Sequence, residues 1–254
     1  TRGGMSGDEL YLSINNITDI LTKNGWYVNK SCGLHVHIDA RDLNARQLAY
    51  ILMVAKLCEP VIYKMMPPSR DTSRWAKRIP MSVSQISKIH DEEDFIDTWY
   101  RSHGTNPSME KYNDARYCGF NMHSRVIHGS IEFRHHSGTL NPSKIINWIE
   151  ICQSIIKTGL DLYYLIEKKQ LSSHVINLAR QRISITRAKE LVKVWRLIQS
   201  IDDKSKLFTV DSMGMVLDLN IILRTHIHYR INRFYDEDKQ DDYNAIGFNP
   251  IIGI

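Results

Sequence analysis

Residues 33–39 are Gly-Leu-His-Val-His-Ile-Asp, and residues 130–136 are Ser-Ile-Glu-Phe-Arg-His-His. Each segment alternates apolar with polar side chains, which predicts a β-strand with one buried face. The apolar set that would face the core is Leu34, Val36, Ile38, Ile131 and Phe133. The polar set on the opposite face is His35, His37, Asp39, Glu132, Arg134 and His136. If the two strands are neighbours in one sheet, imidazole, carboxylate and guanidinium groups meet on one surface.

The composition indicates a soluble, folded protein. Of 254 residues, 43% are hydrophobic, which suffices for a large core, and the apolar runs are far shorter than a bilayer requires. The four cysteines show neither disulfide nor zinc-finger spacing, so we expect a cytoplasmic location. The charge of +5 comes from dispersed basic residues, which suits a small anionic ligand better than nucleic acid.

Helical periodicity predicts three long helices before residue 167. They cover residues 8–23, the stretch from Asn44 to Pro67, and the stretch from Pro142 toward Tyr164. Residues 69–114 are polar and irregular apart from a short helix near 92–100, and a segment of this length is typical of a functional loop.

The remaining elements predict an α+β fold with antiparallel strands. We expect a short strand at 26–28 and a hairpin of residues 116–124 and 130–137, with a turn at His128-Gly129. Later helices are expected around 191–198 and 217–227, and the acidic residues 236–242 are expected to be solvated.

The polar rows are suited to binding a metal and a phosphate. Two histidines that are two residues apart on a strand can bind one metal ion together, and Glu132 can bind a divalent cation. Arg134 can donate two charge-assisted hydrogen bonds to phosphate or carboxylate oxygens. Oxygen ligands favour magnesium or manganese, whereas a mixed set of histidine and glutamate ligands is compatible with manganese or zinc. There are simpler alternatives to a metal and phosphate site. The two histidines would then be half-exposed without a ligand, and Glu132 and Arg134 would form an ion-pair array on the surface.

These residues also carry a family resemblance. Residues 33–37 resemble the Gly-Met-His-x-His element of glutamine synthetases, and residues 132–134 resemble their Glu-x-Arg element. More closely, residues 116–121 followed by 131–140 resemble the amidoligase family, within the glutamine synthetase-like carboxylate-amine ligase superfamily. The similarity covers roughly Trp26 to Trp148, and both signatures occur in the expected order.

The resemblance implies a glutamine synthetase-like antiparallel sheet, in a partial barrel with flanking helices and a helical C-terminal region. It implies a catalytic domain over residues 1–167 and a helical region, 168–254, packed on the same domain. The implied activity is ATP-dependent ligation of a carboxylate to an amine through an acyl-phosphate, forming an amide or isopeptide bond. The implied partners are the nucleotide and an amino acid, peptide or protein substrate.

The resemblance also implies roles for individual residues. His35 and Glu132 would hold Mg²⁺ or Mn²⁺ at the ATP phosphates, His37 would lie beside those phosphates, and Arg134 would bind the phosphoryl group or the acid substrate. Such ligases typically carry an earlier strand with paired acidic ligands. We expect that strand to lie upstream of Thr1, because the sequence opens directly on a helix.

Five further residues are candidates for substrate binding. Asn121 and His123 share a strand face by alternation, whereas Arg116 falls on the opposite face unless a bulge at Gly119 re-aims it. Arg70 would reach phosphate from its loop. His136 is preferred to His135, because alternation along a strand places His136 on the same face as Glu132.

Two alternative functions remain open on the sequence. The His-Val-His-Ile-Asp segment is also similar to the His-x-His of amidohydrolase-like metal-dependent hydrolases, which need a parallel barrel. The second alternative is a catalytically degenerate domain that binds a protein or nucleic acid.

Overall fold

A three-stranded antiparallel sheet brings the two polar segments together. In the computed structural model, which describes residues 4–167, 184–200 and 210–235, the strands are β1 (Val36–Asp39), β2 (Phe120–Asn121) and β3 (Ser130–Phe133). Their order is β1-β3-β2, so β3 is central, with His37 and Asn121 opposite Glu132 on its two sides. The predicted α+β class and the pairing of the two segments are confirmed. The partial barrel stays a prediction, because the described strands form an open sheet.

The two faces of β1 differ as the alternation predicts. Val36 is buried, while His35 and His37 are exposed. On β3, the Phe133 ring makes edge contacts with Phe120 and Trp148, at centroid distances of 5.0 and 6.3 Å. Trp148 belongs to α7 (Pro142–Ile166), so the apolar face of the sheet packs on this helix.

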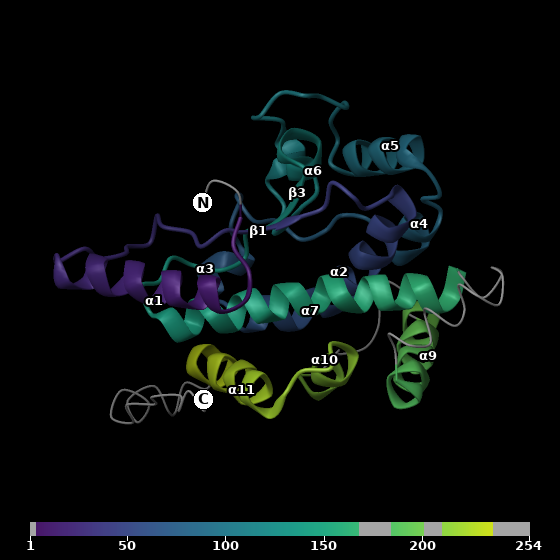
Figure 1. The fold of residues 1–254 in the computed structure, drawn as a ribbon. Helices are drawn as coiled ribbons and strands as arrows, with labels where there is room; N and C mark the ends of the chain where they lie inside the picture. Colours follow the sequence, from purple (N-terminus) through teal and green to yellow (C-terminus); the bar gives the residue numbers. More distant parts are fainter. Residues whose placement is uncertain (1–3, 168–183, 201–209, 236–254) are drawn as a thin grey trace.

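Two long helices, α2 (Ala45–Lys64) and α7, lie side by side and form most of the core (Figure 1). Sixteen of the 20 residues of α2 are buried, so other elements surround it on nearly all sides. The helix begins with a capping box, in which the Asn44 side chain accepts from the Gln47 N–H and the Gln47 side chain accepts from the Asn44 N–H. Gly159 lets the two helix backbones approach closely, since a Cβ added there would lie 2.5 Å from the Ile51 Cα.

The other helices of the N-terminal half agree only partly with those predicted from the sequence. α1 (Gly7–Lys23), which lies against α7, and α5 (Glu92–Ser102) confirm predicted helices, but α3 (Pro68–Asp71), α4 (Val83–Ser87) and the 3-10 turn η1 (Asp114–Arg116) were not expected. The short strand predicted at 26–28 is wrong. Trp26 and Tyr27 lie exposed in an irregular segment, where no described strand pairs with their backbone.

The predicted simple hairpin is also wrong in its connection. β2 and β3 pair antiparallel, but a helix, α6 (His123–His128), joins them instead of a tight turn. Arg125 secures this helix by donating to the Leu43 carbonyl and by an ion pair with Glu92. Gly129 ends the helix with φ of 69°, so the turn signal at this glycine marks a helix C-cap.

The described C-terminal helices pack on α2 and α7 (Figure 1). They are α9 (Ile185–Ser200), α10 (Val210–Val216) and α11 (Ile221–Tyr235). The Trp195 ring of α9 stacks on Tyr50 at 5.4 Å, and Arg230 of α11 donates to the Met65 carbonyl at 3.0 Å. The domain boundary after residue 167 stays a prediction.

The helix expected around 217–227 is confirmed as α11, but it begins at Ile221, because the chain turns between α10 and α11. Asp218 has φ of 54°, and the Asn220 side chain accepts from the Leu223 N–H and so caps α11. The acidic stretch 236–242 lies outside the described residues. Within the described ranges, no helix is both long and apolar enough to span a bilayer.

Replacing Gly159 with alanine should destabilise the protein. Alanine normally stabilises a helix interior by about 1 kcal/mol relative to glycine, but here the added methyl meets the backbone of Ile51. We expect the free energy of unfolding to fall by about 1–3 kcal/mol in urea denaturation. The control Lys157→Ala, on the exposed side of the same helix, should change it by less than about 0.5 kcal/mol. A gain in stability for Gly159→Ala would contradict the close helix packing.

Candidate active site

The carboxylate of Glu132 is the centre of a polar group that we call the Glu132 cluster: His35, His37, Asn121, Glu132 and Arg134. Its Oε1 lies 2.8 Å from Nδ1 of His35 and 3.5 Å from Nε2 of His37. Its Oε2 accepts from the Asn121 side chain at 2.6 Å, and Nη1 of Arg134 lies 3.2 and 3.3 Å from the two oxygens. All three strand segments thus contribute, and the two rows predicted to meet do so.

The environment of Glu132 keeps it ionised. Burial by itself raises the pKa of this carboxyl, but hydrogen bonds from His35 and His37, the charge of Arg134 and the Asn121 amide together lower the pKa well below its usual range. The side chains of Glu132 and Arg134 are both only 7% exposed, whereas those of His35 and His37 are 39% and 44% exposed. The cluster is therefore open to solvent on its imidazole side.

Two serines that sequence reasoning missed complete the contacts of His37. Its Nδ1 lies 2.9 Å from Oγ of Ser130 and 3.3 Å from Oγ of Ser124, and the two hydroxyls are 3.0 Å apart. A neutral imidazole has one donor and one acceptor, so an N–H aimed at Glu132 leaves Nδ1 to accept from a serine hydroxyl. Ser130 was detectable, because it precedes Glu132 by two residues on the same strand; Ser124 was not, since it lies on the unexpected α6.

Two arginines lie at the other side of the cluster. Nε of Arg134 donates to the Trp75 carbonyl at 3.2 Å, and no described residue accepts a hydrogen bond from its Nη2. Arg70, on α3, donates from Nη2 to the Cys32 carbonyl at 2.9 Å. A Cβ on Gly33 would lie 3.1 Å from Nε2 of His35 and 3.3 Å from Nη2 of Arg70, so both side chains border this glycine. Burial and the charge of Arg134 lower the pKa of Arg70.

Three predicted site residues lie elsewhere. The expectation that His123 shares a strand face with Asn121 is wrong, because β2 ends at Asn121 and His123 begins α6. The His123 ring instead contacts the Tyr100 hydroxyl at 2.6 Å and the Glu110 carbonyl at 2.9 Å.

Arg116 and His136 also turn away from the Glu132 cluster. Arg116, at the end of η1, donates to the Lys111 carbonyl and lies over the Tyr112 ring. β3 ends at Phe133, so strand parity does not extend to His136, whose ring packs against Trp148. No bulge at Gly119 brings Arg116 back: the Gly119 carbonyl accepts from the Arg134 N–H in a contact that extends the sheet.

The donor chemistry of the cluster fits a divalent cation in part. Carboxylate oxygen and imidazole nitrogen are ligands for magnesium, manganese or zinc, and His35 and Glu132 present both. However, the described residues contain no group of three His, Cys, Asp or Glu side chains arranged to hold a metal ion. A cation bound here would therefore rely on these two residues plus ligands from the substrate, solvent or another part of the chain.

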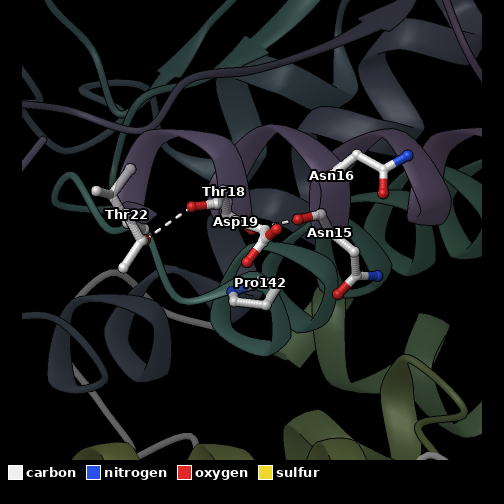
Figure 2. Close-up of a pocket in the computed structure, with 7 residues that line it drawn as sticks. Asn15, Asn16, Thr18, Asp19, Thr22 and Pro142 are labelled. Atoms are coloured by element: carbon white, nitrogen blue, oxygen red, sulfur yellow. Dashed lines mark hydrogen bonds between the residues drawn. The ribbon is translucent and has the colours of Figure 1, made fainter. Parts of the chain in front are cut away.

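A shallow depression of about 490 Å³ lies away from this cluster, where α1 meets the start of α7 (Figure 2). Asn15, Thr18 and Thr22 line it, but both threonine hydroxyls donate to carbonyls of their own helix. No residue of the Glu132 cluster contributes to it. The depression thus offers a helix surface without converging chemistry, and the Glu132 cluster is the better candidate site.

Comparison with known proteins assigns the chain to a family. The model of a family described as "Putative amidoligase enzyme" matches residues 7–156, more than half of the chain, and the chain belongs to this family. The match contains every residue of the Glu132 cluster and ends before α9. Neither the curated proteins nor the solved structures gave a match to the chain.

Removing both charges of the buried pair should cost less than the sum of the losses from removing each one alone. Glu132→Ala leaves the Arg134 guanidinium buried without its carboxylate, and we expect the free energy of unfolding to fall by about 3–5 kcal/mol. The double variant Glu132→Ala/Arg134→Met should be destabilised by clearly less than the sum of the single variants, as a urea-denaturation double-mutant cycle measures.

The matched control is the exposed pair at the end of β1. Asp39 and Arg41 contact each other at 2.7 Å in solvent, so Asp39→Ala should leave the free energy of unfolding almost unchanged. Equal, additive losses for Glu132→Ala and Arg134→Met would show that the two charges do not interact as described.

Proposed function

We propose that this protein is an ATP-dependent carboxylate-amine ligase, which forms an amide or isopeptide bond through an acyl-phosphate. The substrate carboxylate would take the γ-phosphoryl group and release ADP, and the amine would then displace phosphate. Membership of the amidoligase family supports ligase chemistry. The Glu132 cluster is the observation that supports ATP dependence and the acyl-phosphate. In it, a buried carboxylate contacts a buried guanidinium and two solvent-accessible imidazoles.

The roles follow from charge. Phosphoryl transfer to a carboxylate brings anionic oxygens together, so fixed positive groups and cations must be in place before the reaction. Arg134 is preorganised to bind an anion, because the Trp75 carbonyl holds its Nε and Glu132 holds its Nη1, which leaves Nη2 for an anionic oxygen. Arg70, beside His35, would supply a second guanidinium.

His35 and Glu132 would hold a divalent cation, Mg²⁺ or Mn²⁺, which when bound neutralises charge on the phosphate oxygens. His37 would lie beside those phosphates, oriented by Glu132 on one ring nitrogen and by Ser130 and Ser124 on the other. Asn121 would keep the Glu132 carboxylate in position by donating to Oε2. A glutamine synthetase-like sheet and a cytoplasmic setting belong to the same proposal.

Glu132→Gln and Arg134→Lys should strongly reduce ligation. With Mg²⁺, ATP and a panel of amino acids and peptides, the unchanged protein should release ADP and phosphate in a substrate-dependent manner. Each variant should lower kcat/KM by about 100-fold or more, because a preorganised charge is lost from the transition state. Release of ADP and phosphate is measured by coupled assays, and the ligated product by mass spectrometry.

Asp39→Asn is the matched control, because it removes a carboxylate on the same strand that is paired with exposed Arg41, and it should retain activity. Substrate-dependent release that never exceeds the Glu132→Gln background would refute the ligase. Turnover without nucleotide would instead favour a metal-dependent hydrolase. A melting temperature that nucleotide does not raise would favour a degenerate binding domain.

A further inference from the structure

Three polar side chains of α2 hold a short stretch of the irregular chain between α3 and α4. The stretch is residues 75–79, which we call the Trp75 segment. The three side chains, which we call the α2 anchor, are Lys56, Glu59 and Tyr63. Their spacing of three and four residues places them along one face of the helix. Each of them makes a hydrogen bond to the backbone of the Trp75 segment.

The α2 anchor holds the segment at two residues, Ala76 and Ile79. The Tyr63 hydroxyl donates to the Ala76 carbonyl at 2.5 Å. Nζ of Lys56 donates to the Ile79 carbonyl at 2.6 Å, and Oε1 of Glu59 accepts from the Ile79 N–H at 2.7 Å. Ala76 and Ile79 are both buried, so these hydrogen bonds are shielded from water and resist local opening.

The Trp75 segment also pairs with the chain that leads into β2. The Lys77 N–H donates to the Tyr117 carbonyl at 2.9 Å, and the Lys77 carbonyl accepts from the Gly119 N–H at 2.8 Å, which forms a parallel bridge to Cys118. The Gly119 carbonyl in turn accepts from the Arg134 N–H at 2.7 Å. The segment is therefore fixed between the side chains of α2 and the backbone that pairs with Arg134.

This segment contacts both guanidinium-bearing parts of the candidate active site. The Trp75 carbonyl, one peptide unit before the carbonyl that Tyr63 holds, accepts from Nε of Arg134 at 3.2 Å. Nη2 of Arg78 lies 2.5 Å from Oδ1 of Asp71, which follows Arg70 on α3. The orientation of the Arg134 guanidinium thus depends directly on where the Trp75 segment lies.

The α2 anchor places polar groups in the core. Glu59 and Tyr63 are only 3% and 1% exposed. Burial raises the pKa of Glu59 to about 7, although its hydrogen bond from Ile79 and the charge of Lys56 act in the opposite direction. A satisfied buried polar network adds little net stability compared with apolar packing, but it favours one arrangement of the groups that it joins. The α2 anchor therefore fixes the backbone position of the Trp75 segment.

We propose that Lys56, Glu59 and Tyr63 are positioning residues for Arg134, acting through the Trp75 carbonyl. The inference rests on the proposed function, in which Nη2 of Arg134 binds an anionic oxygen of the phosphoryl group or the acid substrate. The guanidinium is planar, so fixing its Nε at the Trp75 carbonyl also fixes the direction in which Nη2 points. A displacement of the segment by about 1 Å would misplace Nη2 and lower the rate by up to about 100-fold.

The first test observes the Nε–H group of Arg134 by NMR in protein labelled with ¹⁵N-arginine. Its signal is assigned by its absence in Arg134→Lys. Tyr63→Phe removes only a hydroxyl, so this variant should fold. In it, exchange of the Arg134 Nε–H with water should be about tenfold faster, the change expected when one hydrogen bond is weakened. Lys56→Met, which keeps the apolar stem and loses the ammonium, should act in the same direction.

The second test uses the kinetics of ligation. Tyr63→Phe should lower kcat/KM about tenfold. Combined with Arg134→Lys, it should lower kcat/KM no further than Arg134→Lys does alone, because Tyr63 acts through the Arg134 guanidinium. The matched control is Tyr50→Phe on the same helix, whose hydroxyl donates to Glu167 at 2.9 Å. It loses a comparable hydrogen bond but should leave both the Arg134 signal and kcat/KM unchanged.

Three results would overturn the proposal. The first is an Arg134 Nε–H that exchanges equally fast in Tyr63→Phe and in the unchanged protein. The second is a change of the same size in Tyr50→Phe, which a general loss of stability predicts. The third is a set of kcat/KM losses that multiply in the double variant. If the unchanged protein ligates no substrate, the proposed function fails, while exchange at Arg134 still decides whether the α2 anchor positions the guanidinium.

Discussion

The register between β1 and β3 is the constraint on which the site depends. His37 lies opposite Glu132, and a slip of one residue would turn every polar side chain of β1 toward the core. Apolar packing sets this register, since Ile131 and Phe133 must face α7. Backbone hydrogen bonds fix both ends of the pairing: Leu34 donates to the His136 carbonyl and Ala40 to the Gly129 carbonyl. The chemistry of one face is therefore positioned by the burial of the other.

The Glu132 cluster also shows how a buried charge is tolerated near a surface. Desolvation disfavours the ionised carboxylate, but two imidazoles, an amide and a guanidinium donate to it and keep it charged. Because the imidazoles come from the β1 segment, the amide from β2 and the guanidinium from the end of β3, the cluster connects all three strands.

The sequence predicts the elements whose pattern is local. Alternation in residues 33–39 and 130–136 identified the strands and the meeting of His35 and His37 with Glu132 and Arg134, and helical periodicity located α2 and α7. The predictions that were wrong concern residues whose structure depends on tertiary contacts. The strand predicted over residues 116–124 ends at Asn121, and His123 begins α6, where Arg125 contacts Glu92 and the Leu43 carbonyl.

The same reason explains the position of His136. Parity holds only while the strand is regular, and β3 ends before His136, whose ring packs against Trp148 of α7. Arg70 borders His35 because the backbone at Gly33 leaves room for both side chains, a contact that no local pattern encodes.

The central claim is that the two polar rows form one nucleotide-phosphate site, and a crystal grown with Mn²⁺ and a non-hydrolysable ATP analogue tests it most directly. We expect an anomalous manganese peak within bonding distance of Glu132 and His35, with phosphate oxygens against Nη2 of Arg134. Manganese and nucleotide bound together elsewhere, with the Glu132 cluster unchanged, would contradict it.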